Sequence, residues 1–236
     1  MTERRLSATK TLHTRYGKTK DMKAKTLLAA GLMMAATAAS SLAQTVYSVN
    51  AVGFVNVECP PGFSLIANPL AAATNTVAVL FPAPTSGTVI FKFNPVTGGF
   101  VSSTFSTFLG GWTDPNMSLV PGEGFFYKNP GATAVTNTFV GNVQQGTLVT
   151  SLGTGFTLAS SQVPQQGLIS TDLGLPNDSG TTVFTFSNAG NGYSSFVFSS
   201  FLGGWSPNEP TIGVGQGFFV RRSTAASWTR TFTVNQ

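Results

Sequence analysis

The sequence predicts an all-β protein built from two tandem sandwich-like units, of jelly-roll or immunoglobulin-like type, that derive from an internal duplication and follow a signal-peptide helix. Three observations predict this class. Short segments of alternating apolar and polar residues are separated by glycine-containing turns, one stretch of sequence occurs twice, and the N-terminal residues have the pattern of an export leader. With 236 residues, of which 42% are hydrophobic, the chain is long enough to bury a core.

The internal repeat is the most informative of these patterns. Segments recur about 93 residues further on, and roughly 27 of the 82 pairs aligned from Gly62 onward are identical without a gap. The matching segments are 62–65 with 155–158, 105–112 with 198–205, and 122–126 with 215–219. We therefore divide the chain into a leader and signal peptide (1–43), a first β-repeat (44–142) and a second β-repeat (143–236). The register is compatible with two abutting modules and with one pseudo-twofold sandwich.

Individual strands follow from alternation and turn residues. The clearest are 90–93 and 183–186, whose phenylalanines share one face. Each is followed by a glycine-containing connection and an aromatic-rich segment, which is typical of a β-hairpin. We expect Gly99 and Gly192 to take the positive-φ position of these two hairpins. The other strands expected are 46–49, 54–57, 63–67, 124–128 and 135–140, with their counterparts in the second copy. Little helix is expected beyond the leader.

The basic net charge of +5 belongs to the N-terminal leader. Eight of the 13 Lys and Arg residues lie in the first 25 positions, against two of the 8 acidic residues. From residue 26 onward the chain therefore has five basic and six acidic side chains, a net charge of −1. This balance offers no electrostatic argument for nucleic-acid binding, and we expect no nucleic-acid partner.

The leader has the parts of a signal peptide. Met22-Lys23-Ala24-Lys25 is a short positive start, and apolar residues follow over 27–38. Small residues then stand at the two positions that signal peptidase reads, so we predict cleavage after Ala43 and a mature chain that starts at Gln44. Because the signal-peptide pattern begins at Met22, translation could start there and not at Met1. A longer, twin-arginine leader is the alternative interpretation of the N-terminal residues. No segment reaches the roughly 18 apolar residues of a membrane span, so none is expected in the mature chain. The predicted location is outside the cell, at the cell surface or in the periplasm of a Gram-negative-type bacterium.

Export also limits the chemistry that the chain is able to perform. It removes the only histidine, His13, and with it any Ser-His-Asp or Cys-His nucleophile system or histidine-bearing zinc site. The lone Cys59 aligns with Leu152 in the repeat, so we expect it to be buried. None of the six acidic residues is kept in both copies, which leaves one asymmetric pair, Asp114 with Glu123, as an alternative for glycosidase chemistry. We predict that the protein is not an enzyme and that it uses no metal or cofactor; no catalytic residue is assigned.

Two pairs of residues are candidates for ligand binding. Trp112 and Trp205 end matching Gly-Gly-Trp segments and are able to stack on sugar rings, although a sandwich core also accepts a large aromatic residue beside two glycines. Lys128 and Arg221 are the charged positions whose sign is kept in both copies, each near the end of a Gly-Phe-Phe strand. They are interpreted either as strand-end charges that protect a sheet edge or as donors to a sugar hydroxyl or to a carboxylate of a partner.

Several of these motifs together resemble a β-module of secreted and surface proteins in Verrucomicrobia and Bacteroidetes. The resemblance is carried by residues 62–70 (GFSLIANPL), 91–94 (FKFN), Trp112 and 121–129 (PGEGFFYKN). The segment 46–53 is similar to the mature start of many verrucomicrobial exports. The second copy departs from the pattern, since Ser161-Gln162 replaces the Asn68-Pro69 step. The resemblance implies an exported β-rich module and supplies no catalytic residues.

The sequence therefore favours an exported, non-enzymatic structural or adhesion module of the cell surface. Two alternatives stay open: a carbohydrate-binding, lectin-like module that uses the two tryptophans, and a surface protein that self-assembles through exposed strand edges. The expected partners are a polysaccharide or other surface proteins, and the oligomeric state is left open.

The interpretation of the leader is testable in a Gram-negative host that exports the chain. We expect the exported product to start at Gln44, because signal peptidase cuts after the small residues that end at Ala43. N-terminal sequencing and the intact mass of the product check this. A product that retains residues 27–38 would contradict the predicted cleavage.

Overall fold

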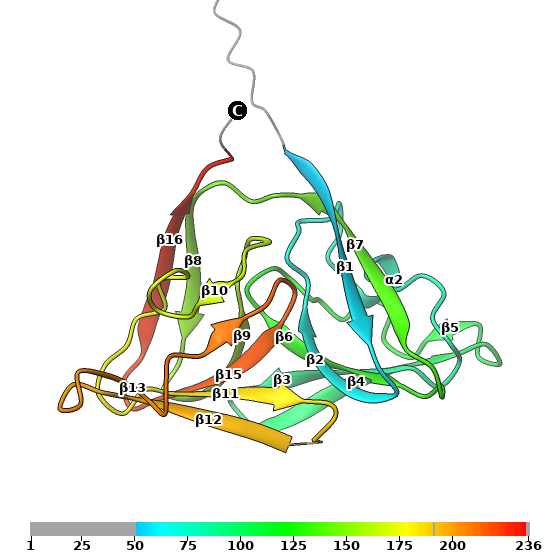
Figure 1. The fold of residues 1–236 in the computed structure, drawn as a ribbon. Helices are drawn as coiled ribbons and strands as arrows, with labels where there is room; N and C mark the ends of the chain where they lie inside the picture. Colours follow the sequence, from blue (N-terminus) through cyan, green and yellow to red (C-terminus); the bar gives the residue numbers. More distant parts are fainter. Residues whose placement is uncertain (1–50, 191, 235–236) are drawn as a thin grey trace, which may run out of the picture. The chain divides into compact units, whose positions relative to one another are not determined.

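The computed structural model describes residues 51–190 and 192–234, which lie within one compact unit, Asn50–Gln236. Their regular structure is almost entirely β-strand (Figure 1), and the helix of the described chain is the short turn α2, Val77–Leu80. The expected all-β class is thereby confirmed. Within these ranges no helix has the length and apolar character needed to cross a membrane. The expected strand at 46–49 and the predicted cleavage site at Ala43 and Gln44 lie outside the described residues.

Most of the strands belong to two five-stranded antiparallel sheets. The first sheet has the order β2-β6-β3-β4-β5, formed by β2 (Gly62–Ala67), β3 (Val89–Asn94), β4 (Gly99–Ser106), β5 (Gly111–Trp112) and β6 (Gly124–Asn129). The second has the order β9-β15-β11-β12-β13, formed by β9 (Gly155–Ser160), β11 (Thr182–Ser187), β12 (Gly192–Ser199), β13 (Gly204–Ser206) and β15 (Gly217–Arg222). Strands at the same position in the two sheets begin at the offset of the sequence repeat, so the two halves of the described chain have the same topology.

Two further strand pairs pack against these sheets. The pairs are β1 (Val52–Cys59) with β7 (Val135–Asn142), and β8 (Gly146–Leu152) with β16 (Ala226–Phe232), both antiparallel. Alternate residues of β1 face inward, and Val55, Val57 and Cys59 contact the core of the first half. In the second half Trp228 of β16 does the same. A short pair, β10 (Gly167–Leu168) and β14 (Thr211–Ile212), completes the second half.

The Gly-Phe-Phe motif of each half connects two hydrophobic clusters. Phe125 of β6 and the equivalent Phe218 of β15 are fully buried in the separate cores of the first and second halves. The next residues, Phe126 and Phe219, point to the opposite face of their strands. They meet in a third cluster, to which both sheets contribute. Each half therefore has a core of its own on one face of its sheet and shares a cluster with the other half on the opposite face.

The expected hairpins β3–β4 and β11–β12 are present, with one correction in each. The positive-φ residue of the first hairpin is Gly98 (φ 68°) and not Gly99, which is the first residue of β4. Asn94 explains the shift, because its side-chain oxygen accepts hydrogen bonds from two backbone N–H groups of the turn and so closes the turn one residue earlier. The prediction for Gly192 is also wrong, because Gly192 is the first residue of β12 and its φ is not positive.

The two halves also meet through backbone hydrogen bonds that occur in two equivalent copies. The Ala67 N–H donates to the Gly215 carbonyl oxygen at 2.8 Å, and the Ser160 N–H donates to the Gly122 carbonyl oxygen at 3.0 Å. The donors are the last residues of β2 and β9, and the acceptors precede β15 and β6. The first strand of each sheet is therefore joined to the segment that enters the Gly-Phe-Phe strand of the other half.

Two glycines allow the backbones to come this close. A Cβ atom on Gly217 would lie 2.9 Å from the Ile66 carbonyl oxygen and 3.2 Å from the Gly124 Cα. A Cβ atom on Gly124 would lie 3.0 Å from the Ala159 carbonyl oxygen. These neighbours are backbone atoms and cannot rotate away, so any side chain at either position would push the two sheets apart.

We predict that Gly217→Ala lowers the free energy of unfolding by about 1–3 kcal/mol, the usual cost of overpacking a closed contact. Urea denaturation of the two proteins measures the difference. The matched control is Gly204→Ala in the same sheet, because no atom lies within 4 Å of that Cβ position. We expect the control to change the free energy of unfolding by less than about 0.5 kcal/mol. Equal effects of the two substitutions would contradict the close approach at Gly217.

Candidate functional site

The two tryptophans predicted as stacking platforms are half-buried and contact different cores. The indole N–H of Trp112 donates to the Phe81 carbonyl oxygen at 2.9 Å, and its ring lies 5.5 Å from the ring of Phe105. Trp205 makes the equivalent ring contact with Phe198 at 5.6 Å, and its N–H also donates within the fold. The structure therefore does not bring the two rings together, and each one packs within its own half. This arrangement favours the packing interpretation of both residues.

Lys128 and Arg221 lie on interior strands. Lys128 is in β6, which is hydrogen-bonded to β2 and β3, and Arg221 is in β15, which is hydrogen-bonded to β9 and β11. The Lys128 ammonium group is 5.7 Å from the centre of the Phe63 ring, within the range of a cation–π contact. Arg221 is exposed and stands opposite Phe156, the equivalent of Phe63. The two charges therefore do not protect a sheet edge; they stand beside aromatic rings.

Those rings belong to an aromatic cluster at the contact between the two sheets. Its members are Phe63, Phe91, Phe93, Phe100 and Phe126 in the first half, and Phe156, Phe184, Phe186, Tyr193 and Phe219 in the second. The strand register explains the grouping, because residues directly opposite each other point to the same face, as Phe91 and Phe126 do. The aromatic cluster is therefore a consequence of alternation in four strands of each sheet.

Two equivalent edge-to-face contacts are the shortest that join the halves inside this cluster. The Phe93 ring centroid lies 5.2 Å from that of Phe219, with an interplanar angle of 88°. The equivalent contact, between Phe126 and Phe186, has a distance of 5.3 Å and an angle of 89°. Pairs of this geometry stabilise a fold by about 0.5–1.5 kcal/mol beyond the burial of their area. The near identity of the two contacts means that the halves meet symmetrically.

Two open pockets remain beside these contacts. The first has a volume of about 320 Å³ and is lined by Phe63, Phe91, Phe100, Phe126, Phe186 and Tyr193. The second has a volume of about 400 Å³ and is lined by Phe93, Gly98, Phe156, Phe184, Tyr193 and Phe219. We call these the aromatic pockets. Each takes most of its rings from one half and is completed by the other half, and rim residues such as Phe100 and Tyr193 are 46% and 52% exposed.

The turns of the β4–β5 and β12–β13 hairpins display large apolar side chains to solvent. Phe108 and Phe201 are each 94% exposed. The residues that follow them, Leu109 and Leu202, are 68% and 66% exposed. We call these two Phe-Leu pairs the apolar tips. The repeated segment that contains them was identified from the sequence. A possible binding role was assigned to the tryptophan of that segment, and the Phe-Leu pair was not considered.

Both apolar tips have the same backbone conformation. The Gly110 N–H and the Gly203 N–H each donate to the carbonyl oxygen three residues earlier, at 3.3 Å. The two glycines have φ angles of 78° and 70°, in the left-handed region that favours glycine. The turn geometry therefore presents the same pair of side chains in the same way in both halves.

A third, more polar pocket of about 310 Å³ lies between the segment before β6 and the strands β8 and β9. Phe93, Glu123, Thr150 and Gln162 contribute to its lining. The Glu123 carboxylate is 2.9 Å from the ammonium group of Lys92, and the Gln162 amide donates to the Thr150 hydroxyl at 2.8 Å. Glu123 aligns with a glutamine in the second half, so this carboxylate is present in one half only.

Asp114 and Glu209 lie in loops and take part in local hydrogen bonds. Asp114 lies after β5, where its backbone N–H donates to the Ser103 hydroxyl at 3.0 Å. Glu209 accepts hydrogen bonds from the N–H and the hydroxyl of Thr171, at 2.8 and 2.7 Å. In the ranges that the structure describes, no three His, Cys, Asp or Glu residues are grouped so that they could hold a metal ion.

Cys59 is completely buried and is a free thiol, as expected from its alignment with leucine. Its sulfur accepts a hydrogen bond from the Asn137 amide at 3.3 Å. Burial raises the pKa of the thiol, so the nucleophilic thiolate is disfavoured at neutral pH. These contacts make Cys59 a packing residue.

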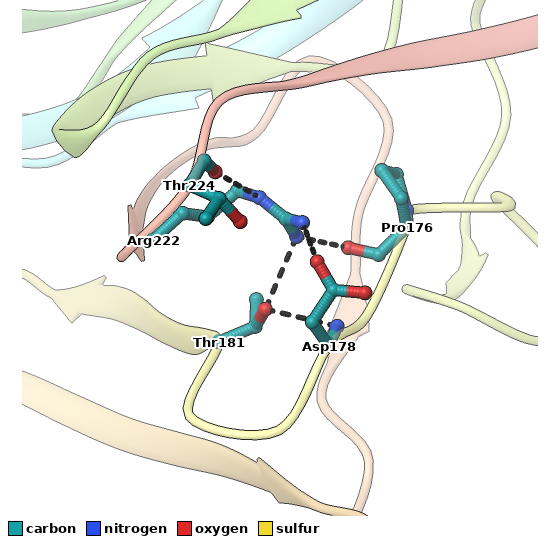
Figure 2. Close-up of polar contacts among 5 residues, drawn as sticks. All are labelled: Pro176, Asp178, Thr181, Arg222 and Thr224. Atoms are coloured by element: carbon teal, nitrogen blue, oxygen red, sulfur yellow. Dashed lines mark hydrogen bonds and ion pairs between the residues drawn. The ribbon is translucent and has the colours of Figure 1, made fainter.

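A buried arginine that sequence reasoning did not single out organises the second half (Figure 2). The side chain of Arg222 is only 2% exposed and forms an ion pair with Asp178. Its guanidinium group also donates to the Pro176 carbonyl oxygen at 2.6 Å and to the Thr181 hydroxyl at 3.1 Å, and its Nε donates to the Thr224 carbonyl oxygen at 3.2 Å. The hydrogen bonds and the ion pair of Arg222 therefore connect the end of β15 to the loop that precedes β11.

The equivalent position in the first half holds Asn129, which is also buried. Its amide group donates to the carbonyl oxygens of Cys59 and Thr133, at 3.1 and 2.8 Å. Its side-chain oxygen accepts a hydrogen bond from the Gly131 N–H at 2.9 Å. Both halves therefore place a buried polar side chain at the end of the Gly-Phe-Phe strand, but the residue and its partners differ.

We predict that Arg222→Ala lowers the free energy of unfolding by about 2–4 kcal/mol, because it removes a buried side chain together with its ion pair to Asp178 and its hydrogen bonds to Pro176 and Thr181. Urea denaturation provides the measurement. The neighbouring Arg221 is exposed, so Arg221→Ala is the matched control and is expected to change the value by less than about 0.5 kcal/mol. A loss at Arg221 as large as the loss at Arg222 would contradict this assignment.

Comparison of the chain with protein-family models, with curated proteins and with solved structures found no match. A functional assignment therefore depends on the geometry of the described residues. Its main features are two apolar tips, two aromatic pockets and one polar pocket.

Proposed function

We propose that the protein is an exported, non-enzymatic structural or adhesion module of the cell surface, and that it makes contact through its two apolar tips. The observation that carries this proposal is the exposure of the tips. Phe108 and Phe201 are each 94% exposed and are the same residue in both halves. An exposed Phe-Leu pair that occurs in the same form in both halves suits a contact with another molecule.

The fold itself gives no reason to keep these side chains. A ring that is 94% exposed has few neighbours in its own chain, so it adds little packing energy. Roughly two thirds of the aligned positions differ between the two copies. The stretch 105–112 nevertheless differs from 198–205 at a single position, Thr107 against Ser200. Retention of an exposed Phe-Leu pair under such divergence favours a role outside the chain.

Export, internal duplication and kinship with the verrucomicrobial type of β-module are parts of the same proposal. The signal-peptide pattern before Gln44 supports export. The equal strand order of the two sheets and their equivalent edge-to-face contacts support duplication. The near-neutral charge from residue 26 onward suits a structural module whose contacts are apolar.

Carbohydrate binding is a second candidate, and the polar pocket is the observation that favours it. Phe93 provides an apolar wall there, and Glu123, Thr150 and Gln162 provide hydrogen-bonding groups. An aromatic face combined with a few polar groups is suited to a sugar ring. The two tryptophans suit this role less well, because they are half-buried and use their indole N–H groups within the fold.

Retention on cells tests the proposed function. The full chain is exported from a Gram-negative host, purified and mixed with intact cells of the bacterium that encodes it. We expect the protein to sediment with the cells. A double variant, Phe108→Ser with Phe201→Ser, should lose retention by about tenfold or more, because rings that anchor a contact carry most of its energy.

Val96→Ser is the matched control, since Val96 is 91% exposed on the turn of another hairpin and aligns with Ala189. This variant should be retained as well as the unaltered chain. Absence of retention, or retention that the double variant keeps in full, would overturn the proposal. Binding to an insoluble polysaccharide that is lost in Glu123→Gln but kept in the double variant would favour the second candidate instead.

A further inference from the structure

We infer that the apolar tips of one molecule insert into the aromatic pockets of a second copy, so that the protein assembles with itself. The inference rests on the proposed function for the contact role of the tips, and it deepens that function by naming the partner. Three observations carry it: the size of the pockets, the apolar side chains that line the pockets and form the tips, and the occurrence of tips and pockets in equal number.

The aromatic pockets are large enough to hold a tip. An apolar cavity of about 150 Å³ is sufficient to bind a benzene ring. The two pockets have volumes of about 320 and 400 Å³, so each can hold the ring of Phe108 together with part of the Leu109 side chain. A tip does not occupy a pocket of its own molecule, because Phe108 and Phe201 remain 94% exposed.

The chemistry of the two surfaces is complementary. The pockets are lined by aromatic rings and one glycine, so an inserted phenylalanine leaves no buried charge without a partner. Rim rings such as Phe100 and Tyr193 are about half exposed, so their outer surfaces can make further edge-to-face contacts like those inside the aromatic cluster. The incoming ring would therefore extend an arrangement that already holds the two halves together.

Electrostatics do not oppose contact between two copies. The chain from residue 26 onward has a net charge of −1, and no charged residue lies in 104–113 or 197–206, the segments around the tips. Like-charge repulsion between two molecules is therefore small. The lack of Lys and Arg beside the tips also argues against an anionic lipid surface as their partner, since such surfaces attract basic side chains.

The symmetry of the halves determines how many contacts a molecule makes. Each half contributes one tip and most of one aromatic pocket. A tip and a pocket are different surfaces, so their contact is heterologous and can continue beyond a dimer. A single tip buries far less than the roughly 1,200 Å² of a stable interface. Assembly therefore depends on several weak contacts acting together.

Complementation between two variants tests the inference. The tip variant carries Phe108→Ser and Phe201→Ser, and the pocket variant carries Phe100→Asn and Tyr193→Asn. Light scattering of the exported unaltered chain should give a mass that rises with concentration beyond that of a dimer. Each variant alone should associate about tenfold more weakly or not at all. An equimolar mixture should regain association, because intact pockets of one variant meet intact tips of the other.

Folding of the pocket variant is checked separately, because its two rings also make internal contacts. Val101→Asn is the matched control, since Val101 is 49% exposed and, as the neighbour of Phe100 along β4, points to the opposite face. It should associate like the unaltered chain. A second measurement does not need the pocket variant: a photoreactive phenylalanine analogue at position 108 should cross-link two chains through peptides that line an aromatic pocket. Cross-links confined to other surfaces would overturn the inference.

The outcomes also separate the inference from the proposed function. A mass that stays monomeric at all concentrations overturns the inference, whereas retention on cells would still support the proposed function. A mixture of the two variants that fails to associate, while each remains folded, overturns it as well. Sedimentation of a monomeric chain with phosphatidylcholine–phosphatidylglycerol vesicles would assign the tips to a lipid surface and would overturn it too. Self-association without retention on cells would contradict the proposed function alone.

Discussion

The close approach of two backbones at Gly124 and Gly217 is the contact on which the arrangement of the two halves depends. The Cβ position of Gly217 is 3.2 Å from the Gly124 Cα, so neither residue has room for a side chain. This proximity lets Ala67 and Ser160 donate their backbone N–H groups across the junction. Buried backbone groups need such partners. The second glycine of the Gly-x-Gly-Phe-Phe motif therefore controls how the two sheets meet.

The phenylalanines that follow these glycines place aromatic rings on both faces of the Gly-Phe-Phe strands. Successive residues of a strand face opposite sides, so Phe125 fills the core of its own half while Phe126 reaches the other half. The rings of the shared face meet edge to face where the two halves touch, and the face stays open beside these contacts. The two aromatic pockets are the space that remains. There are two pockets because both halves have the same strand order, which also explains why two equivalent glycines lie at the close approach of the backbones.

Much of the fold was predictable from the sequence, and the site was not. Segments 90–93 and 124–128 lie in strands as expected, because alternation is a local property of the chain. The position of the turn glycine, Gly98, depends on side-chain hydrogen bonds that alternation does not reveal. The aromatic pockets depend on rings from both halves, whose relative placement no local pattern encodes. Within one repeated segment, Trp112 packs against the core and Phe108 is exposed to solvent. The segment includes a turn, where no hydrophobic periodicity indicates which of the two aromatic residues is buried.

The two halves differ at their buried polar position and agree at their apolar tips. Asn129 and Arg222 occupy equivalent places and satisfy different loop acceptors. That position requires only that buried polar groups find partners, so more than one residue meets the requirement. No internal requirement of this kind acts on Phe108 and Phe201, which are almost fully exposed. The proposed contact with a partner accounts for their identity. If that partner is a second copy of this chain, its two aromatic pockets provide one surface for each tip.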